Sequence, residues 1–154
     1  MGEVTFKEIV YKSLTDLLED RYQSMKANWD VLLESNQQEG KSSAGDKHET
    51  GAAMIHLEME QLGKQLEELK RHVEEVVRWG PENVILDQRV AMGSLVETTT
   101  GLYYMITGYG KLEVEGKEVY VIGPASPMGK ALMGKIAGDR FEWGRVRGVI
   151  GSIE

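Results

Sequence analysis

The chain has 154 residues, of which 41% are hydrophobic and 28% are charged. This composition is typical of a globular protein and excludes a disordered or collagen-like chain. The absence of cysteine excludes disulfides, thiolate zinc sites and cysteine nucleophiles. No apolar run approaches the roughly 18 to 20 residues of a membrane span, and the N-terminus lacks a signal-peptide pattern. We therefore expect a cytoplasmic protein with no membrane partner.

The net charge of −7 is concentrated in the first half of the chain. Residues 1–80 contain 10 Lys and Arg against 16 Asp and Glu, a net of −6, whereas residues 81–154 contain 8 against 9, a net of −1. An acidic surface repels nucleic-acid phosphates, so we expect no direct DNA binding. A partner with a basic surface, or a metal ion, is the better expectation.

Residues 1–80 are predicted to form two long helices, because apolar side chains return at heptad spacing on both sides of one interruption. Charged residues fall between them, on the face expected to be solvated. The first stripe contains Leu18, Tyr22, Met25, Trp29 and Leu32, and the second contains Ile55, Met59, Leu62, Leu66, Leu69, Val73 and Val76.

The interruption, residues 37–46, is polar and contains two glycines, which favours a reversal between antiparallel helices. A coiled-coil hairpin is therefore predicted, with arms of about 45 Å for some 30 residues and an acidic tip near residues 40–50. The same stripes are also typical of helices that build a bundle or dimerise, so the oligomeric state stays open.

A second domain is predicted for residues 81–154, because Pro81 forbids further helix and the apolar spacing shifts towards two. With about 70 residues and no cross-links, this domain has a modest core. We expect its stability to depend on packing against the base of the hairpin. Ser126 and Pro127 open a short helix that Gly134 can close. The fold class is thus α+β, with predicted strands at residues 89–96, 101–106, 111–114, 118–122 and 146–153.

Asp46 and Glu49 lie three residues apart at the start of the second helix, so both project from one end of it. Two exposed carboxylates could share a Mg²⁺ ion, which takes hard oxygen ligands. The alternative is structural: Asp46 is the N-cap of the helix, and Glu49 at the third helical position completes a capping box. Negative charge is favourable at a helix N-terminus in any case. Spacing alone favours capping.

The segment from Gly45 to Thr50 resembles the Gly-Asp-x-x-Glu-Asn tip motif of the Gre family of bacterial transcript cleavage factors. The segment from Ser126 to Lys135 resembles the Ser-Pro stretch and the following Leu-x-Gly-Lys turn of the Gre C-terminal domain, which has an FKBP-like fold. The order and spacing of the two motifs agree, so the resemblance covers nearly the whole chain.

The resemblance implies an accessory factor rather than a free-standing enzyme. In the family the hairpin enters the secondary channel of bacterial RNA polymerase, and the tip carboxylates help to hold the second Mg²⁺ of the active centre, where backtracked RNA is cleaved. Asp46 and Glu49 would then be the metal-directing pair, assisting catalysis in trans. The β-rich domain would dock at the channel rim through residues that include Ser126, Pro127, Lys130, Leu132, Gly134 and Lys135.

The sequence departs from the family pattern at the tip. Thr50 replaces the usual asparagine, and residues 51–54 lack the tyrosine that commonly follows. These departures favour channel binding over stimulation of cleavage.

Two alternatives of other classes remain. One is a helical hairpin that only binds another protein or dimerises, with Asp46 and Glu49 as caps. The other is a peptidyl-prolyl isomerase, which the FKBP-like fold suggests and which needs an apolar pocket lined by aromatic residues. Aromatic residues of a small β domain are more often core.

Overall fold

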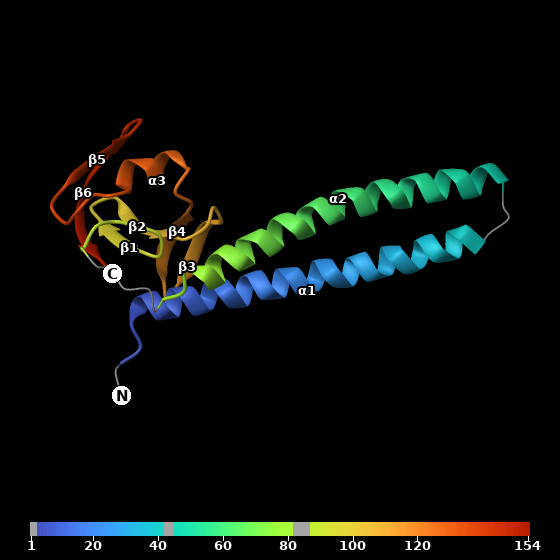
Figure 1. Ribbon diagram of the computed structural model, residues 1–154, viewed down its shortest axis with the longest axis horizontal. Helices are drawn as coiled ribbons and strands as arrows, with labels where there is room; N and C mark the ends of the chain where they lie inside the picture. Colours follow the sequence, from blue (N-terminus) through green and yellow to red (C-terminus); the bar gives the residue numbers. More distant parts are fainter. Residues whose placement is uncertain (1–2, 42–44, 82–86) are drawn as a thin grey trace. The chain divides into compact units, whose positions relative to one another are not determined.

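The computed structural model describes residues 3–41, 45–81 and 87–154, without the side chains of residues 39–41 and 45–49. It confirms the α+β class, because a hairpin of two long helices precedes a β-rich domain with one short helix (Figure 1). None of the described helices could cross a lipid bilayer. The elements are α1 (Phe6–Lys41), α2 (Gly45–Arg78), β1 (Leu95–Thr98), β2 (Gly101–Met105), β3 (Gly110–Val114), β4 (Lys117–Ile122), α3 (Pro127–Leu132), β5 (Arg140–Trp143) and β6 (Val146–Ile153).

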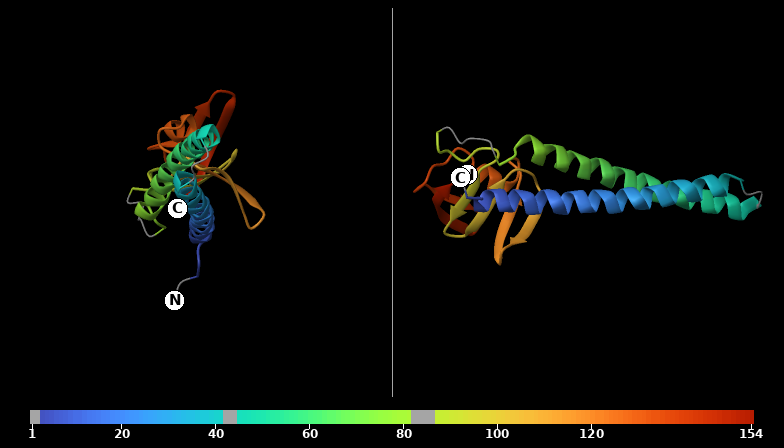
Figure 2. Two further views of the ribbon diagram at one scale, coloured as in Figure 1. Left: turned by 90° about the vertical axis from the view of Figure 1, so that its right-hand side faces the viewer. Right: turned by 90° about the horizontal axis from the view of Figure 1, so that it is seen from below.

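The two predicted apolar stripes are the inner faces of the hairpin. Every stripe residue is buried or half-buried, whereas the acidic and basic residues from Glu58 to Arg71 that lie between them are exposed. The helices approach closely where Trp29 of α1 meets Gly63 of α2, since a Cβ added to Gly63 would lie 3.4 Å from Cζ3 of Trp29. All three views show α1 and α2 side by side (Figures 1 and 2). The two apolar stripes with heptad spacing therefore pack against each other within one chain.

The predicted reversal at residues 37–46 was too long. Helix α1 continues to Lys41 and α2 begins at Gly45, so residues 37–41 and 45–46 are helical. Gln37, Gln38 and Glu39 are adequate helix formers, and adding a residue to an existing helix gains a hydrogen bond without a new nucleation cost. Residues 42–44 lie outside the described part of the chain.

The chain divides into two compact units, residues 17–73 and residues 1–16 together with 74–154. The second unit therefore contains the first turns of α1 and the last turn of α2. The ammonium group of Lys7 donates to the carbonyl oxygen of Glu154 at 3.2 Å, and the hydroxyl of Thr107 donates to a carboxylate oxygen of Glu75 at 2.7 Å. The boundaries between these two units lie within α1 and α2, at residues 16/17 and 73/74. The predicted domain boundary between residues 80 and 81 therefore stays a prediction.

The sheet has the strand order β3-β4-β2-β1-β6-β5. Its neighbours are antiparallel except β2 and β4, which pair in parallel with Tyr103 opposite Tyr120. The parallel pair places two tyrosines from distant segments on adjacent strands, and their rings stack with centroids 5.6 Å apart. This stack becomes part of a pocket described below.

Two strand predictions need correction. The predicted strand at residues 89–96 begins only at Leu95. The backbone of Val90 instead forms hydrogen bonds with Gly134 and Lys135. Residues 91–94 form a turn, closed by hydrogen bonds between Ala91 and Ser94. The strand β5 was missed, although its residues alternate between charged and aromatic side chains. It pairs with β6 so that Phe141 faces Gly148.

Tyr104 is the largest fully buried side chain of the β-rich unit. Its hydroxyl has no hydrogen-bond partner among the described residues. Burial, with a smaller contribution from Tyr11, holds the pKa of the Tyr104 phenol well above its ordinary value. A buried hydroxyl without a partner is a net destabilising group.

We therefore expect Tyr104→Phe to leave the free energy of unfolding unchanged or to raise it by about 1 kcal/mol. The matched control is Tyr103→Phe, which removes a 2.9 Å hydrogen bond between the phenol and the Thr100 hydroxyl. That control should lose about 1 kcal/mol. Urea denaturation of the two variants measures both values, and a loss for Tyr104→Phe equal to that of the control would contradict the prediction.

Candidate functional site

The segment that resembles the Gre tip motif lies at the N-terminal end of α2. Gly45 is the first residue of that helix, and Asp46 and Glu49 follow within its first two turns, about 4.5 Å apart along the axis. Both residues therefore lie at the turn end of the hairpin. Their side chains lie outside the described part of the chain, so metal binding and capping both stay predictions. Elsewhere, the described side chains contain no group of three or more His, Asp and Glu residues placed to hold a metal.

The second motif forms the start of α3 as predicted. The Ser126 hydroxyl accepts a hydrogen bond from the backbone N–H of Gly129 at 3.0 Å and donates to the carbonyl oxygen of Gly123 at 2.7 Å. Pro127 occupies the first helical position, where no backbone N–H is needed. Ser126 is thus a capping residue, and its side chain is already occupied by backbone partners.

The other residues expected to dock a partner fall into two groups. Lys130 is exposed and Lys135 is half-buried, so both can reach a ligand. Leu132 is fully buried in the hydrophobic core, where it supports this surface from beneath. Gly134 adopts a φ of 79° and accepts a hydrogen bond from the Arg89 guanidinium at 3.0 Å. Its role is to turn the chain after α3.

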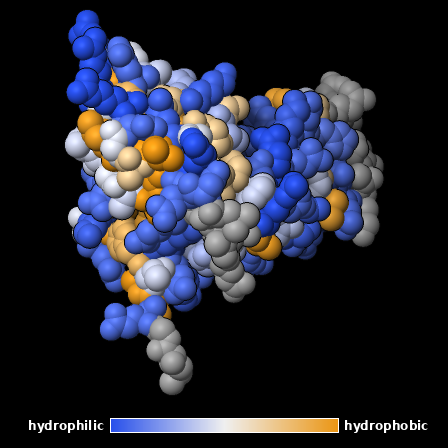
Figure 3. All heavy atoms as spheres, turned by 60° about the vertical axis from the view of Figure 1, so that its left-hand side comes forward, coloured by the Kyte–Doolittle hydropathy of each residue, from blue (hydrophilic) through white to orange (hydrophobic). Residues whose placement is uncertain are grey.

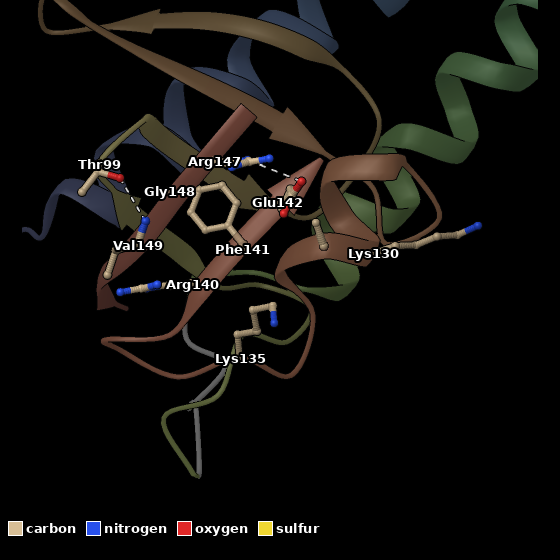
Figure 4. A pocket seen from close by; sticks show the side chains of 10 residues that line it. Thr99, Lys130, Lys135, Arg140, Phe141, Glu142, Arg147, Gly148 and Val149 are labelled. Atoms are coloured by element: carbon tan, nitrogen blue, oxygen red, sulfur yellow. Dashed lines mark hydrogen bonds and ion pairs between the residues drawn. The ribbon is translucent and has the colours of Figure 1, made fainter. Parts of the chain in front are cut away.

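Next to α3 lies a pocket of about 750 Å³ that we call the basic pocket. Phe141 occupies its floor, because Gly148 opposite has no side chain: a Cβ there would come within 2.6 Å of the Phe141 ring. The Arg147 guanidinium and the Glu142 carboxylate form an ion pair of 3.5 Å. Figure 4 shows this pair on one side of the Phe141 ring and Arg140 and Lys135 on the other. The lining residues are Thr99, Lys130, Ala131, Lys135, Arg140, Phe141, Glu142, Arg147, Gly148 and Val149.

A second pocket of about 690 Å³, the aromatic pocket, lies beside the first, and Arg147 lines both. Tyr103 and Tyr120 form one wall with their stacked rings. Trp143 of β5 is 48% exposed at this pocket. Most of the lining surface is apolar, which is the kind of pocket that the isomerase alternative requires. Its lining residues are Thr100, Tyr103, Tyr120, Ile122, Ser126, Pro127, Met128, Trp143, Arg145, Val146 and Arg147.

Sequence reasoning identified only part of this surface. Ser126, Pro127, Lys130 and Lys135 were named as docking residues, but the cationic residues of β5 and β6 were not. The available signal was the run from Arg140 to Arg147, where cationic residues lie on both sides of Gly144 and two aromatic residues precede it. Such a run predicts a hairpin with one charged and one aromatic face.

Comparisons with known proteins give structural likeness alone. No family model matches the sequence, and no curated protein matches it. Among solved structures, the chain is similar to the transcription factor Gfh1, with 19% identity and a TM-score of 0.37 over 92% of this chain and 94% of that one. It is also similar to GreA factor homolog 1 of Thermus thermophilus, with 18% identity, a TM-score of 0.35, and 91% and 94% coverage. For Gfh1 of Thermus aquaticus the identity is 17%, the TM-score 0.33, and the coverage 92% and 94%.

The start of α3 should tolerate no side chain at Gly129. An added Cβ would collide with the carbonyl oxygen of Gly123 and lie 2.9 Å from the Ser126 hydroxyl oxygen, disrupting the cap. We expect Gly129→Ala to lower the free energy of unfolding by roughly 1 to 3 kcal/mol. Gly108→Ala is the control, because no atom lies within 4 Å of the Cβ position there. Thermal unfolding of both variants tests this, and equal midpoints would contradict it.

Proposed function

We propose that this chain is an accessory transcription factor of the Gre type, which inserts its helical hairpin into the secondary channel of bacterial RNA polymerase. In this role it modulates elongation and contacts backtracked RNA only through the polymerase. The observation that carries the proposal is the hairpin itself, whose turn is followed directly by the Gly45–Thr50 motif.

The dimensions of the helices support this role. Helix α1 has 36 residues and α2 has 34, so each is about 50 Å long. Helices of this length, paired through continuous apolar stripes, exceed what the core of a small domain requires. The apolar stripes of the two helices are buried or half-buried along the described part of the hairpin, which favours a rigid probe over a module that must dimerise to bury these stripes.

The tip chemistry fits a shared divalent ion. Asp46 and Glu49 offer hard oxygen donors from neighbouring turns of one helix, and Mg²⁺ commonly takes only one or two protein carboxylates. When held jointly with the polymerase, the ion would supply electrostatic stabilisation to the phosphoryl oxygens of the cleaved bond. Asp46 and Glu49 would hold and orient the ion. The polymerase would supply the remaining ligands, so the chain is not itself an enzyme.

Channel binding ranks above stimulation of cleavage in this proposal. Thr50 stands where the family has asparagine, and no tyrosine follows within residues 51–54. These residues directly follow the carboxylate pair on the same helix, so the departures from the family pattern bear on cleavage rather than on insertion of the hairpin.

The test is transcript shortening in stalled, backtracked elongation complexes, with the wild-type chain and an Asp46→Asn, Glu49→Gln double variant. If the tip carboxylates direct the ion, the variant loses at least tenfold in cleavage rate, equivalent to about 1.4 kcal/mol. The matched control is Asp16→Asn, Glu19→Gln, which removes two exposed carboxylates at the same spacing on α1. The control should cleave like the wild type.

Two further outcomes are decisive. Absence of cleavage combined with competition against a genuine cleavage factor identifies a channel-binding regulator. Absence of both effects overturns the polymerase proposal and leaves the interaction-module alternative, for which the solution mass of the chain should then exceed that of a monomer.

A further inference from the structure

The basic pocket gathers positive charge that the protein does not neutralise. Arg147 is paired with Glu142, but Lys130, Lys135 and Arg140 have no carboxylate within 4 Å among the described residues. The lining therefore carries a local charge of +3, from four cations and one carboxylate, in a chain whose net charge is −7. An anionic ligand would supply the counter-charge that these cations lack.

The cations are held by separate elements around a recessed floor. Lys130 comes from α3, Lys135 from the segment after it, Arg140 from β5 and Arg147 from β6. Figure 4 shows Lys130 extending outward from α3, whereas Lys135, Arg140 and Arg147 surround Phe141. Guanidinium groups bind phosphate oxygens with two parallel hydrogen bonds, and ammonium groups add point charges.

The Phe141 floor of the basic pocket contacts the tyrosine wall of the aromatic pocket. The Phe141 ring packs edge-on against the Tyr103 ring, with centroids 6.4 Å apart. The Tyr103 ring also stacks on the Tyr120 ring. Tyr120 is still 37% exposed, and Trp143 is 48% exposed. Arg147 lines both pockets, so a ligand can present an anion to one and a planar apolar group to the other. In the space-filling view, hydrophobic side chains reach the surface in small groups among hydrophilic ones (Figure 3).

We propose that the two pockets form one site for a nucleotide unit, with the phosphate in the basic pocket and the base against Tyr120 and Trp143 in the aromatic pocket. Stacking on exposed aromatic rings next to cations is the general means by which proteins hold single-stranded nucleic acids and nucleotides. The same chemistry serves a free nucleotide and the end of a single-stranded RNA.

An acidic peptide is the competing occupant, because carboxylates would also be attracted by the cations. The aromatic lining favours the nucleotide, because the partly exposed rings of Tyr120 and Trp143 both line this pocket and suit a planar base better than an aliphatic side chain. The acidic first half of the chain does not argue against the site, since all lining residues belong to residues 99–149.

The experiment is an NMR titration of the full chain, without polymerase, using AMP, inorganic phosphate, an eight-nucleotide single-stranded RNA and an oligo-glutamate peptide in separate arms. AMP and the RNA should shift the signals of both pockets, including the Trp143 indole. Phosphate should shift only the basic pocket. A dissociation constant at least tenfold lower for the RNA than for AMP identifies RNA as the source, and comparable values identify a free nucleotide.

Variants separate the two halves of the site. Arg140→Ala should weaken AMP and phosphate binding by about tenfold, the size of one charge-assisted contact. Trp143→Ala should weaken AMP but leave phosphate unchanged, and Trp143→Phe should restore part of the AMP affinity. Lys111→Ala is the control, because it also removes one positive charge but lies on β3 outside both pockets. Circular dichroism confirms that each variant is folded.

The proposal is overturned if AMP and the RNA leave both pockets unshifted, if the peptide shifts them and the nucleotides do not, or if AMP binds no better than phosphate. Since no polymerase is present, failure here does not bear on the hairpin, and failure of the cleavage test does not bear on this site.

Discussion

Burial of the ends of the long helices is the constraint on which the β-rich unit depends. Val10 and Leu14 of α1 and Val76 of α2 are fully buried within that unit, although they belong to helices that continue beyond it. A domain of about 70 residues without disulfides or metal buries too little surface to be comfortably stable alone. The buried residues at these two helix ends add apolar surface to the unit that contains the sheet.

Polar contacts fix the same junction. Lys7 is almost fully buried, and its ammonium donates to the backbone of Glu154, the last residue of the chain. Burial lowers the pKa of Lys7, while the nearby Glu154 carboxylate opposes that shift. The hydrogen bond between Thr107 and Glu75 adds a second link, from the segment after β2 to the end of α2. Both bonds join residues far apart in the sequence, so they form only when the unit is complete.

The same packing produces the two candidate functional regions by different means. The tip of the hairpin follows from helix length and one turn, so its chemistry is local. The pockets instead require α3, β2, β4, β5 and β6 to be in place, and Gly148 to leave room for the Phe141 ring. One chain therefore carries a local candidate site and a tertiary candidate site that can be tested separately.

The sequence by itself determined the hairpin, the change of structure after Pro81, the cap at Ser126 and most strands, because these depend on periodicity, turn chemistry and side chains a few residues apart. It placed the carboxylates Asp46 and Glu49 at the start of α2, and it named Lys130 and Lys135. Only the tertiary structure decided that β2 and β4 pair in parallel, that Val90 bonds to the turn after α3, and that Arg140 and Arg147 line one pocket with those lysines. These features arise from contacts between distant segments, whose selection depends on packing of the whole unit rather than on any local pattern.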